Sequence, residues 1–410
     1  MPVLRPSGSD FTSFVKAAAQ YVAPGRTAKV SKSGGVPVAL PGLGAIVRTS
    51  QVGALASPTT SAVIINGVTP PAAVAAAVAV VIRVLLGIVT TLAGSTSGSS
   101  NGTGTGASFN QPHGVTVIPS TGDIIVADTN NHRIRLVTPG GVVTTLAGSG
   151  QAFADGTGAA ASFNSPWGVA VIPSSGVIVV ADHANHRIRL VTYPGGVVTT
   201  LAGSGQAFAD GTGAAASFNS PTAVAVIPSS GVIVVADLSN HRIRLVTPGG
   251  VVTTLAGSGT PAFANGTGTG ASFNGPYGVA VLPDGNIVVA DQTNHRIRLV
   301  TPGGVVTTLA GSGSPAFVDG TGTAASFYYP TGVAVTSTGD IVVADQSNHR
   351  IRLVTYPGGV VTTLAGGGAG SADGTGTGAN FNNPASVALN PLTGTIVVAD
   401  TNNHRIRLIV

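Results

Sequence analysis

Histidine is the side chain in this sequence best suited to bind a metal or to move a proton near neutral pH. Six of the eight histidines stand in the tripeptide Asn-His-Arg, which recurs at intervals of 54 or 55 residues. A metal site needs several ligands around one point, whereas each repeat supplies one His and one Asp. We therefore expect these histidines to form structural hydrogen bonds, and we expect no metal or other cofactor. They are His132, His186, His241, His295, His349 and His404.

Aspartate and arginine recur in the same repeat, where they could pair their charges or bind phosphate. The Asp ends a Val- and Ile-rich run, and two Arg alternate with Ile, which places both on one face of a strand. A carboxylate at a tight turn accepts backbone N–H groups and pairs with a guanidinium. We expect ion pairs and hydrogen bonds between repeats, and a phosphate-binding ring of arginines is the alternative. The structural set is Asp128, Asp182, Asp237, Asp291, Asp345 and Asp400, with Arg133, Arg187, Arg242, Arg296, Arg350 and Arg405.

Each repeat contains four strand-like runs separated by turn residues. Val, Ile and Thr dominate the runs, and the turns read Pro-Ser-Ser-Gly and Pro-Gly-Gly. Four short antiparallel strands per repeat, packed radially, make one blade of a β-propeller. In the second repeat the runs are Gly168–Ile172, Val177–Ala181, His186–Val191 and Val197–Ala202.

The two ends of the repeat region complete each other. The last repeat stops after its third run, His404–Val410, and the missing fourth run is matched by Gly87–Gly94 near the start. This arrangement predicts an all-β fold, a six-bladed β-propeller in which Gly87–Gly94 completes the blade of His404–Val410. Such a 3+1 closure removes two free sheet edges. We assign residues 87–410 to the propeller.

The repeats resemble the NHL-repeat family in its long variant, which reads TLAG…DG…A.F..P.GVAV…VAD..NHRIR. All six units match this pattern, over roughly four-fifths of the chain. The resemblance implies a six-bladed propeller that binds protein, nucleic acid or another ligand. It does not identify which, since a fold does not fix a function.

The connections between repeats are about 20 residues long and are expected on one rim, together with the turns that follow the Asp. The repeats diverge there, at the residue after a fixed Pro and at the residue after the fixed Asp. Trp and Tyr are common anchors of binding surfaces. We expect this rim to contact a ligand, and drift at exposed positions is the alternative. The candidate ligand-binding residues are His113, Trp167, Thr222, Tyr277, Thr331 and His183.

The net charge of +5 is unevenly divided along the chain. Residues 1–86 carry seven basic residues and one acid, or +6, and residues 87–410 carry 12 Arg and 13 Asp, or −1. Since phosphate binding requires a basic surface, near-neutral repeats favour the structural interpretation of the arginines.

Catalysis has little support in the sequence. The chain has no Cys and no Glu, which excludes thiolate nucleophiles and disulfides and leaves Asp as the only acid. His113 is the one imidazole expected at the channel mouth, and a three-His metal centre cannot be assembled there. We therefore predict no enzyme, with a propeller lyase or hydrolase as the less favoured alternative.

Residues 1–86 are expected to form a basic segment that serves as an anchor or assembly region. Phe11–Val22 has the apolar stripe of an amphipathic helix. The apolar run Ala72–Ile82 is too short to span a bilayer, so no transmembrane span is expected. No signal peptide is expected, because no apolar run follows Met1–Asp10.

These observations predict a non-catalytic binding or scaffold propeller that contacts a protein or ligand within a larger assembly. Exposure outside a cell, on a virion or a cell surface, is compatible with the composition. A nucleic-acid-binding propeller is the alternative, and the sequence does not name the partner.

Overall fold

The computed structural model describes residues 49–50, 62–63 and 87–410. Strands β1 (Thr49–Ser50) and β2 (Ala62–Val63) pair with each other in antiparallel orientation. The helix expected at Phe11–Val22 and the apolar run Ala72–Ile82 lie outside the described residues. Within the described part, no helix has the length and hydrophobicity needed to cross a membrane.

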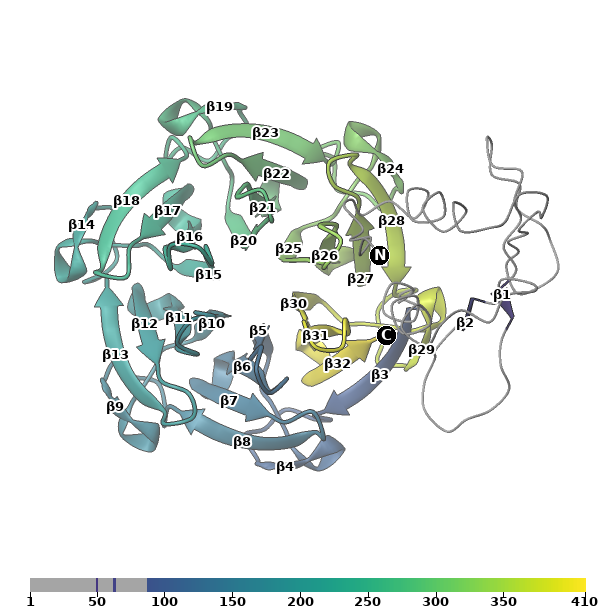
Figure 1. The fold of residues 1–410 in the computed structure, drawn as a ribbon, viewed down its shortest axis with the longest axis horizontal. Coiled ribbons are helices and arrows are strands. Elements are labelled where there is room, and N and C mark those ends of the chain that lie inside the picture. The colour runs from purple at the N-terminus through teal and green to yellow at the C-terminus, as the bar shows by residue number, and fades with distance from the viewer. Residues whose placement is uncertain (1–48, 51–61, 64–86) are drawn as a thin grey trace, which may run out of the picture. The chain divides into compact units, whose positions relative to one another are not determined.

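Residues 87–410 form six antiparallel sheets arranged as blades around a central axis (Figure 1). Each sheet has five strands, one more than the four expected. The additional strand has two residues, comes from the connection before the blade and pairs with the outermost long strand. From the axis outward, the first blade consists of β5 (Pro112–Val117), β6 (Ile124–Asp128), β7 (Arg133–Val137), β8 (Val142–Ala147) and β4 (Gly102–Thr103).

The other five blades repeat this order of strands. The second holds β9 (Gly156–Thr157), β10 (Pro166–Val171), β11 (Ile178–Asp182), β12 (Arg187–Val191) and β13 (Val197–Ala202). The third holds β14 (Gly211–Thr212), β15 (Pro221–Val226), β16 (Ile233–Asp237), β17 (Arg242–Val246) and β18 (Val251–Ala256). The fourth holds β19 (Gly266–Thr267), β20 (Pro276–Val281), β21 (Ile287–Asp291), β22 (Arg296–Val300) and β23 (Val305–Ala310). The fifth holds β24 (Gly320–Thr321), β25 (Pro330–Val335), β26 (Ile341–Asp345), β27 (Arg350–Val354) and β28 (Val360–Ala365). The sixth holds β29 (Gly374–Thr375), β30 (Pro384–Leu389), β31 (Ile396–Asp400), β32 (Arg405–Ile409) and β3 (Ile88–Ala93).

Two 3-10 helices of three residues accompany each blade, one after the two-residue strand and one after the repeated Asp. The first kind comprises η1 (Gly104–Gly106), η3 (Gly158–Ala160), η5 (Gly213–Ala215), η7 (Gly268–Gly270), η9 (Gly322–Ala324) and η11 (Gly376–Gly378). The second kind comprises η2 (Thr129–Asn131), η4 (His183–Asn185), η6 (Leu238–Asn240), η8 (Gln292–Asn294), η10 (Gln346–Asn348) and η12 (Thr401–Asn403).

The ring closes where the sequence predicted. Strand β3 pairs with β32, with Val89 opposite Ile409 and Ala93 opposite Ile406. The two strands lie side by side in Figure 1, although more than 300 residues separate them. This pairing confirms the 3+1 closure, and it leaves the described propeller without a break between its first and last blades.

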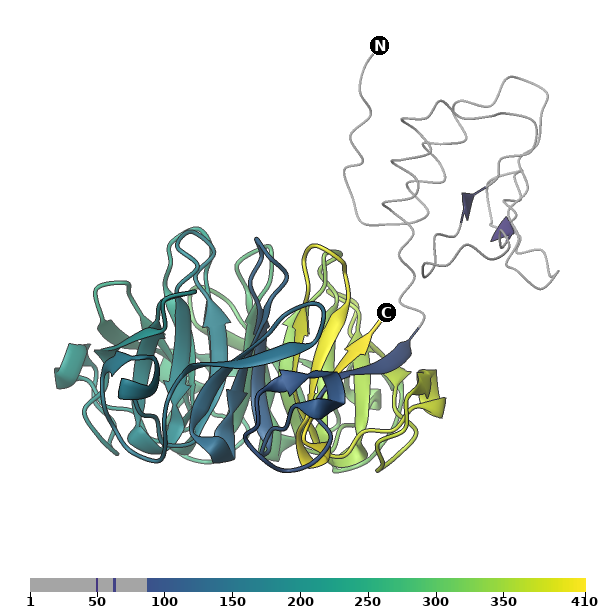
Figure 2. The same cartoon turned by 90° about the horizontal axis from the view of Figure 1, so that it is seen from below.

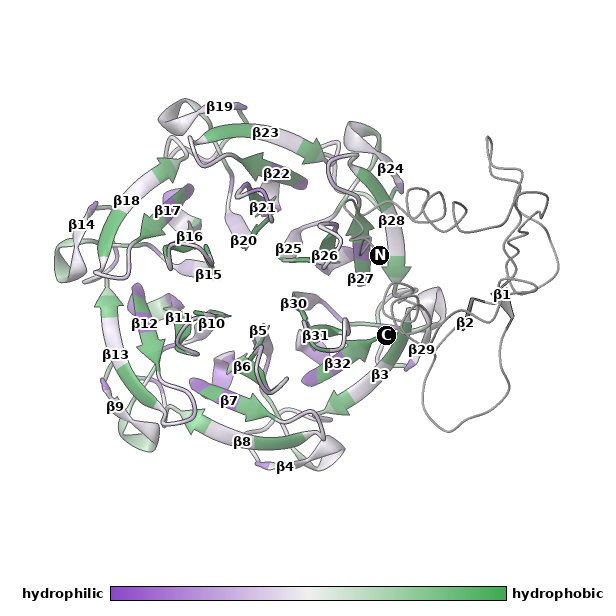
Figure 3. Cartoon of the chain, viewed as in Figure 1, coloured by the Kyte–Doolittle hydropathy of each residue, from purple (hydrophilic) through white to green (hydrophobic). Residues whose placement is uncertain are grey.

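The apolar core lies between neighbouring blades. All five residues of the second long strand in each blade, such as Ile124–Asp128, are buried, so both faces of this strand are covered. Figure 3 shows the apolar colour along these central strands. One Phe from each connection is fully buried, and Phe163 packs in a cluster with Ile125 of the first blade and Ile178 of the second. The six members of this set are Phe109, Phe163, Phe218, Phe273, Phe327 and Phe381.

Glycine on the innermost strands lets neighbouring blades approach closely at the axis. A Cβ on Gly278 would lie 2.0 Å from the carbonyl oxygen of Thr331, and a Cβ on Gly114 would lie 2.1 Å from that of Trp167. No side chain fits at such distances, so these positions require glycine. The contact between inner strands leaves only a narrow channel.

Each blade contains a buried ion pair between the repeated Asp and an Arg. In the first blade, Asp128 and Arg135 are both fully buried, and Oδ2 of Asp128 lies 2.6 Å from Nη1 of Arg135. Burial raises the pKa of Asp128, although Arg135 and two hydrogen-bond donors oppose that shift. The equivalent carboxyls are Asp182, Asp237, Asp291, Asp345 and Asp400, and the equivalent guanidiniums are Arg189, Arg244, Arg298, Arg352 and Arg407.

This geometry corrects the expectation that ion pairs join neighbouring blades. Every ion pair among the described residues lies within one blade, and the partner of the Asp is the second arginine of Arg-Ile-Arg. The first arginine instead binds backbone carbonyls: Arg187 donates to the oxygens of Asn185 and Ser204, both at 2.7 Å. Its guanidinium also lies 4.1 Å from the ring centre of Phe153. Carbonyl contacts of this kind are also made by Arg242, Arg296, Arg350 and Arg405.

The repeated histidines make one set of hydrogen bonds between neighbouring blades. His132 has left-handed backbone geometry, and its Nδ1 accepts the backbone N–H of Ser165, in the second blade, at 3.0 Å. The same bond recurs around the ring, closing with His404 and Gln111. Burial lowers the pKa of these histidines, so the neutral ring needed to accept the bond is favoured. The other four are His186, His241, His295 and His349.

Candidate binding mouth

The start of each innermost strand defines one rim of the propeller, which we call the mouth rim. Pro112, the first residue of β5, lies opposite Asp128, the last residue of β6, so the 3-10 turn after the Asp stands at this rim. The hairpins that join the first two long strands project from the opposite rim, which is uppermost in Figure 2. We call this the hairpin rim.

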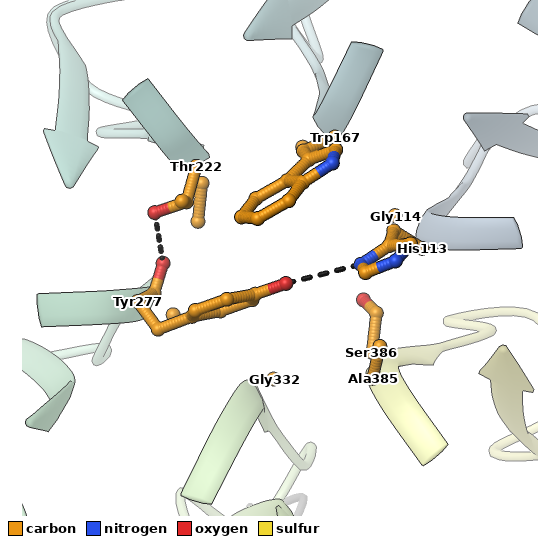
Figure 4. Close-up of a pocket in the computed structure, with 11 residues that line it drawn as sticks. His113, Gly114, Trp167, Thr222, Tyr277, Gly332, Ala385 and Ser386 are labelled. Atoms are coloured by element: carbon orange, nitrogen blue, oxygen red, sulfur yellow. Dashed lines mark hydrogen bonds between the residues drawn. The ribbon is translucent and has the colours of Figure 1, made fainter. Parts of the chain in front are cut away.

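Three aromatic side chains from different blades meet at the centre of the mouth rim (Figure 4). The rings of His113 and Trp167 are stacked with their centres 5.0 Å apart, and Trp167 and Tyr277 are stacked at 5.4 Å. Tyr277 crosses from the fourth blade to the first, where its hydroxyl lies 3.0 Å from Nδ1 of His113. His183 stacks on Trp167 at 3.7 Å. These four residues form the central aromatic cluster.

The two threonines among the candidate residues have a different environment. Thr222 and Thr331 are buried, with exposed fractions of 1% and 0%. Thr222 donates its hydroxyl to the carbonyl of Tyr277 in the next blade at 2.8 Å, and Thr331 donates to that of Pro384 at 3.4 Å. Their hydroxyls therefore join blades and are not available to a ligand.

Similar bonds come from the residue after the repeated Asp. Thr129 donates to the carbonyl of Pro166 and Thr401 to that of Pro112, both at 2.7 Å. Nδ1–H of His183 donates to the carbonyl of Pro221 at 3.3 Å. The sequence places these residues at the rim but does not show that their side chains link adjacent blades.

The aromatic cluster lines part of a pocket of about 40 Å³ at the axis. Its lining includes His113, Trp167 and Tyr277, with glycine and small residues from the innermost strands. Such a volume accommodates water-sized molecules, not an organic ligand. A larger ligand would therefore rest on the mouth rim, over the aromatic cluster, without entering the channel.

The aromatic cluster carries no formal charge at neutral pH. Burial lowers the pKa of His113 to about 4 and that of His183 to about 4. Burial also raises the pKa of the Tyr277 hydroxyl, which stays protonated. Within residues 87–410, no group of three His or Asp side chains is placed to hold a metal ion. The cluster can stack, pack and form hydrogen bonds with an uncharged group.

A second aromatic group lies on the mouth rim, which the sequence did not predict. Tyr328 and Tyr329 of the fifth blade stack with ring centres 5.2 Å apart, and Tyr329 contacts the ring of His295 edge-on at 4.8 Å. Tyr328 is 38% exposed. A signal was available, because the other blades have Asn at the position of Tyr328 and small or amide residues at that of Tyr329.

The sequence matches one family model and is similar to proteins from plants and vertebrates. The family model described as "NHL repeat" matches residues 109–135, 163–189, 218–244, 273–298, 327–352 and 381–407. The chain is 32% identical to the Arabidopsis thaliana protein SUPPRESSOR OF QUENCHING 1, chloroplastic, over 60% of this chain and 25% of that protein. It is 31% identical to NHL repeat-containing protein 2 of Gallus gallus, over 73% of this chain and 46% of that protein. The match thus spans less than half of either relative.

Solved structures share the fold. A Bacteroides thetaiotaomicron protein of unknown function superimposes with a TM-score of 0.62 at 21% identity, covering 78% of this chain and 75% of that chain. An auxiliary nutrient binding protein from the same organism superimposes with a TM-score of 0.60 at 18% identity, covering 79% and 76%. At these identities the likeness shows the propeller architecture alone.

Proposed function

Because the chain belongs to the NHL-repeat family, we propose that its propeller is a non-catalytic binding module that contacts its partner through the mouth rim. The observation that carries this proposal is the central aromatic cluster. Trp167 and its aromatic neighbours stand at the one place where all six blades converge, on a rigid scaffold. Rigid aromatic anchors at the centre of a surface are typical of binding sites.

The differences between blades support the same face. His113 and Trp167 are partly exposed, whereas their counterparts Thr222, Thr331 and Ala385 are buried. The exposed aromatic surface of the mouth therefore comes from the first and second blades, since Tyr277 is buried. A partner that contacts this surface would bind the propeller in a single orientation about its axis.

The proposal includes the division of the chain. Residues 87–410 would present the mouth rim, and the basic residues 1–86 would anchor the propeller in a larger assembly. A version of the protein that lacks residues 1–70 should then bind the partner through the mouth but fail to enter the assembly. Normal incorporation of that version would contradict the anchoring role.

The test of the mouth rim compares substitutions on the two rims. Trp167→Ala removes the centre of the aromatic cluster, and Leu392→Ala removes the side chain on the hairpin rim that is 57% exposed. We expect proteins captured from the native source to be lost with Trp167→Ala and retained with Leu392→Ala. Equal capture by both variants would refute the proposal. A steep loss of capture with added salt would identify a phosphate-rich partner instead.

A further inference from the structure

The tyrosine pair of the fifth blade is held in a strained backbone. Tyr329 has φ of +51°, the left-handed region that bulky side chains rarely adopt. The five equivalent positions hold Gln111, Ser165, Ser220, Gly275 and Asn383, which are smaller or better suited to this geometry. Strain of this kind often accompanies a functional constraint. The strained residue supports Tyr328 from behind, so that the exposed ring is presented to solvent.

The backbone fixes this pair across the interface between the fourth and fifth blades. The N–H of Tyr329 donates to Nδ1 of His295 in the fourth blade at 3.2 Å. The N–H of Tyr328 donates to Oδ1 of Asp345 in its own blade at 2.8 Å, and its carbonyl accepts the N–H of Ser347. The backbone that carries the exposed ring is therefore fixed on both sides of the interface.

Two glutamines begin the turns that hold the backbone of the pair: η10, whose Ser347 N–H donates to the carbonyl of Tyr328, and η8, which leads to His295. Gln292 begins η8 of the fourth blade and Gln346 begins η10 of the fifth, at the position where Thr129 and Thr401 bond to a neighbouring blade. Both glutamines are partly exposed, and among the described residues neither amide has a hydrogen-bond partner. Each offers one acceptor and two donor hydrogens to a ligand.

The carboxylates of this part of the rim are paired with arginines, and the exposed one, Asp319, bonds Arg352. Asp291 and Asp345 are fully buried and paired with Arg298 and Arg352. His295 is an acceptor for a backbone N–H and is favoured in its neutral form.

The nearby cations are also engaged. Arg296 donates to the carbonyl of Ser312 at 2.7 Å and lies over the ring of Phe263, and Arg350 donates to that of Gly367 at 3.1 Å. Their N–H groups are therefore used within the propeller, and the two glutamine amides are the polar groups left for a ligand.

We propose that the mouth rim between the fourth and fifth blades binds an uncharged carbohydrate chain, with Tyr328 as the stacking platform and Gln292 and Gln346 as the hydroxyl-binding groups. A pyranose ring offers C–H groups on its face and hydroxyls at its edge. This chemistry matches an aromatic face flanked by free amides. The inference rests on the proposed function and names the chemical class of the ligand on that face.

The sequences of two other blades provide the variant that tests this inference. Tyr328→Asn with Tyr329→Ser gives the fifth blade the Asn-Ser sequence found in the second and third blades, so the fold tolerates it. The variant removes the platform without leaving a residue foreign to the repeat. Its melting temperature should stay close to that of the unaltered chain.

The test is calorimetric titration of the full chain with neutral hexasaccharides of glucose, mannose, galactose and xylose, alongside hexagalacturonate and oligothymidylate. We expect at least one neutral hexasaccharide to bind with a Kd that changes little with salt. The double variant should weaken this binding at least tenfold, and Leu392→Ala on the hairpin rim should leave it unchanged.

Three results would overturn the inference: no neutral hexasaccharide binds, only the charged polymers bind, or the double variant binds the sugar as well as the unaltered chain. The results also distinguish failure of this inference from failure of the proposed function. If capture of the native partner depends on Trp167 but no sugar binds, the ligand class is wrong and the mouth remains the contact face. If sugar binds while capture ignores Trp167, the central contact is wrong.

Discussion

The buried Asp–Arg pairs of the propeller, which we call the frame, are the same in every repeat, whereas the mouth rim differs from repeat to repeat. In the frame, Asp128 and its five counterparts bind an arginine in the same geometry in every blade. At the mouth, the residue after the fixed Pro differs among blades, and so does its environment: Trp167 is partly exposed while Thr222 is buried. Variation among repeats therefore does not by itself identify a binding residue, since Thr222 varies and still joins two blades.

A buried ion pair can define a structure without adding much stability, because desolvation opposes the attraction of the charges. Burial raises the pKa of Asp291 even though Arg298 lies 2.6 Å away, so desolvation outweighs the attraction. Such pairs contribute little net free energy, but removing one partner leaves an unpaired charge in the interior.

The largest effect is expected from Asp291→Ala, which leaves the fully buried Arg298 with the amide of Asn265 but no carboxylate. The free energy of unfolding should fall by about 3–5 kcal/mol, measured by chemical denaturation. Asp182→Ala is the matched control, because Arg189 keeps the carboxylate of Asp155. Asp182→Ala should lower the free energy of unfolding by less than Asp291→Ala does. Equal losses would show that the carboxylate of Asp155 does not compensate for that of Asp182.

Acid should weaken the contacts between blades. The six repeated histidines have pKa values lowered by burial, and each accepts an N–H through Nδ1, so their neutral form belongs to the folded state. Their contribution is complete above the unfolded pKa of about 6.5 and is lost as the pH falls through the lower folded values. Melting temperatures measured from pH 7.5 down to 5 should decline, and His241→Gln should reduce that decline; a flat profile would contradict this role.

A smaller effect is expected from Thr222→Val, which keeps the shape of the side chain but removes the hydrogen bond to the carbonyl of Tyr277. The loss should be about 1 kcal/mol, because the carbonyl is left without this donor. Partner binding should survive, since the Thr222 hydroxyl is buried. Loss of partner binding without loss of stability would show that Thr222 contacts the partner.

The smallest effect is expected from Asp155→Asn. Asp155 is half exposed and pairs with Arg189, and the first and fourth blades have Asn101 and Asn265 at this position. Exposed ion pairs contribute about 0–1 kcal/mol, so thermal unfolding should change little. A loss comparable to that of Asp182→Ala would mean that the outer carboxylate is as important as the buried one.

Much of the fold could be predicted from the sequence because the same pattern of strands and turns occurs in six repeats. The match between Gly87–Gly94 and the missing strand of the last repeat was sufficient to predict ring closure. The two-residue fifth strand was missed, since Gly-Thr has no strand pattern and its pairing depends on the neighbouring Val142 and Val143. The sequence did not show which arginine pairs with Asp128, because Arg133 lies opposite it in register and yet the side chain of Arg135 reaches the carboxylate.

At the candidate site, the sequence placed His113, Trp167 and Tyr277 at one rim but could not show that they touch. Their contact depends on the narrow channel, which lets Tyr277 reach from the fourth blade to the first. The expectation for Thr222 and Thr331 as ligand contacts did not anticipate their burial, which a neighbouring blade provides. Tyr328 and Tyr329 were overlooked because they lie before the fixed Pro, outside the positions compared.

The sequence by itself determined the number of blades, the strands within each and the closure of the ring, since these follow from local patterns repeated at a fixed interval. Only the tertiary structure decided which side chains meet across the axis, which arginine enters the interior and which rim residues stay exposed. Those outcomes depend on distances between blades, and residues in different blades are brought together only when the ring has closed.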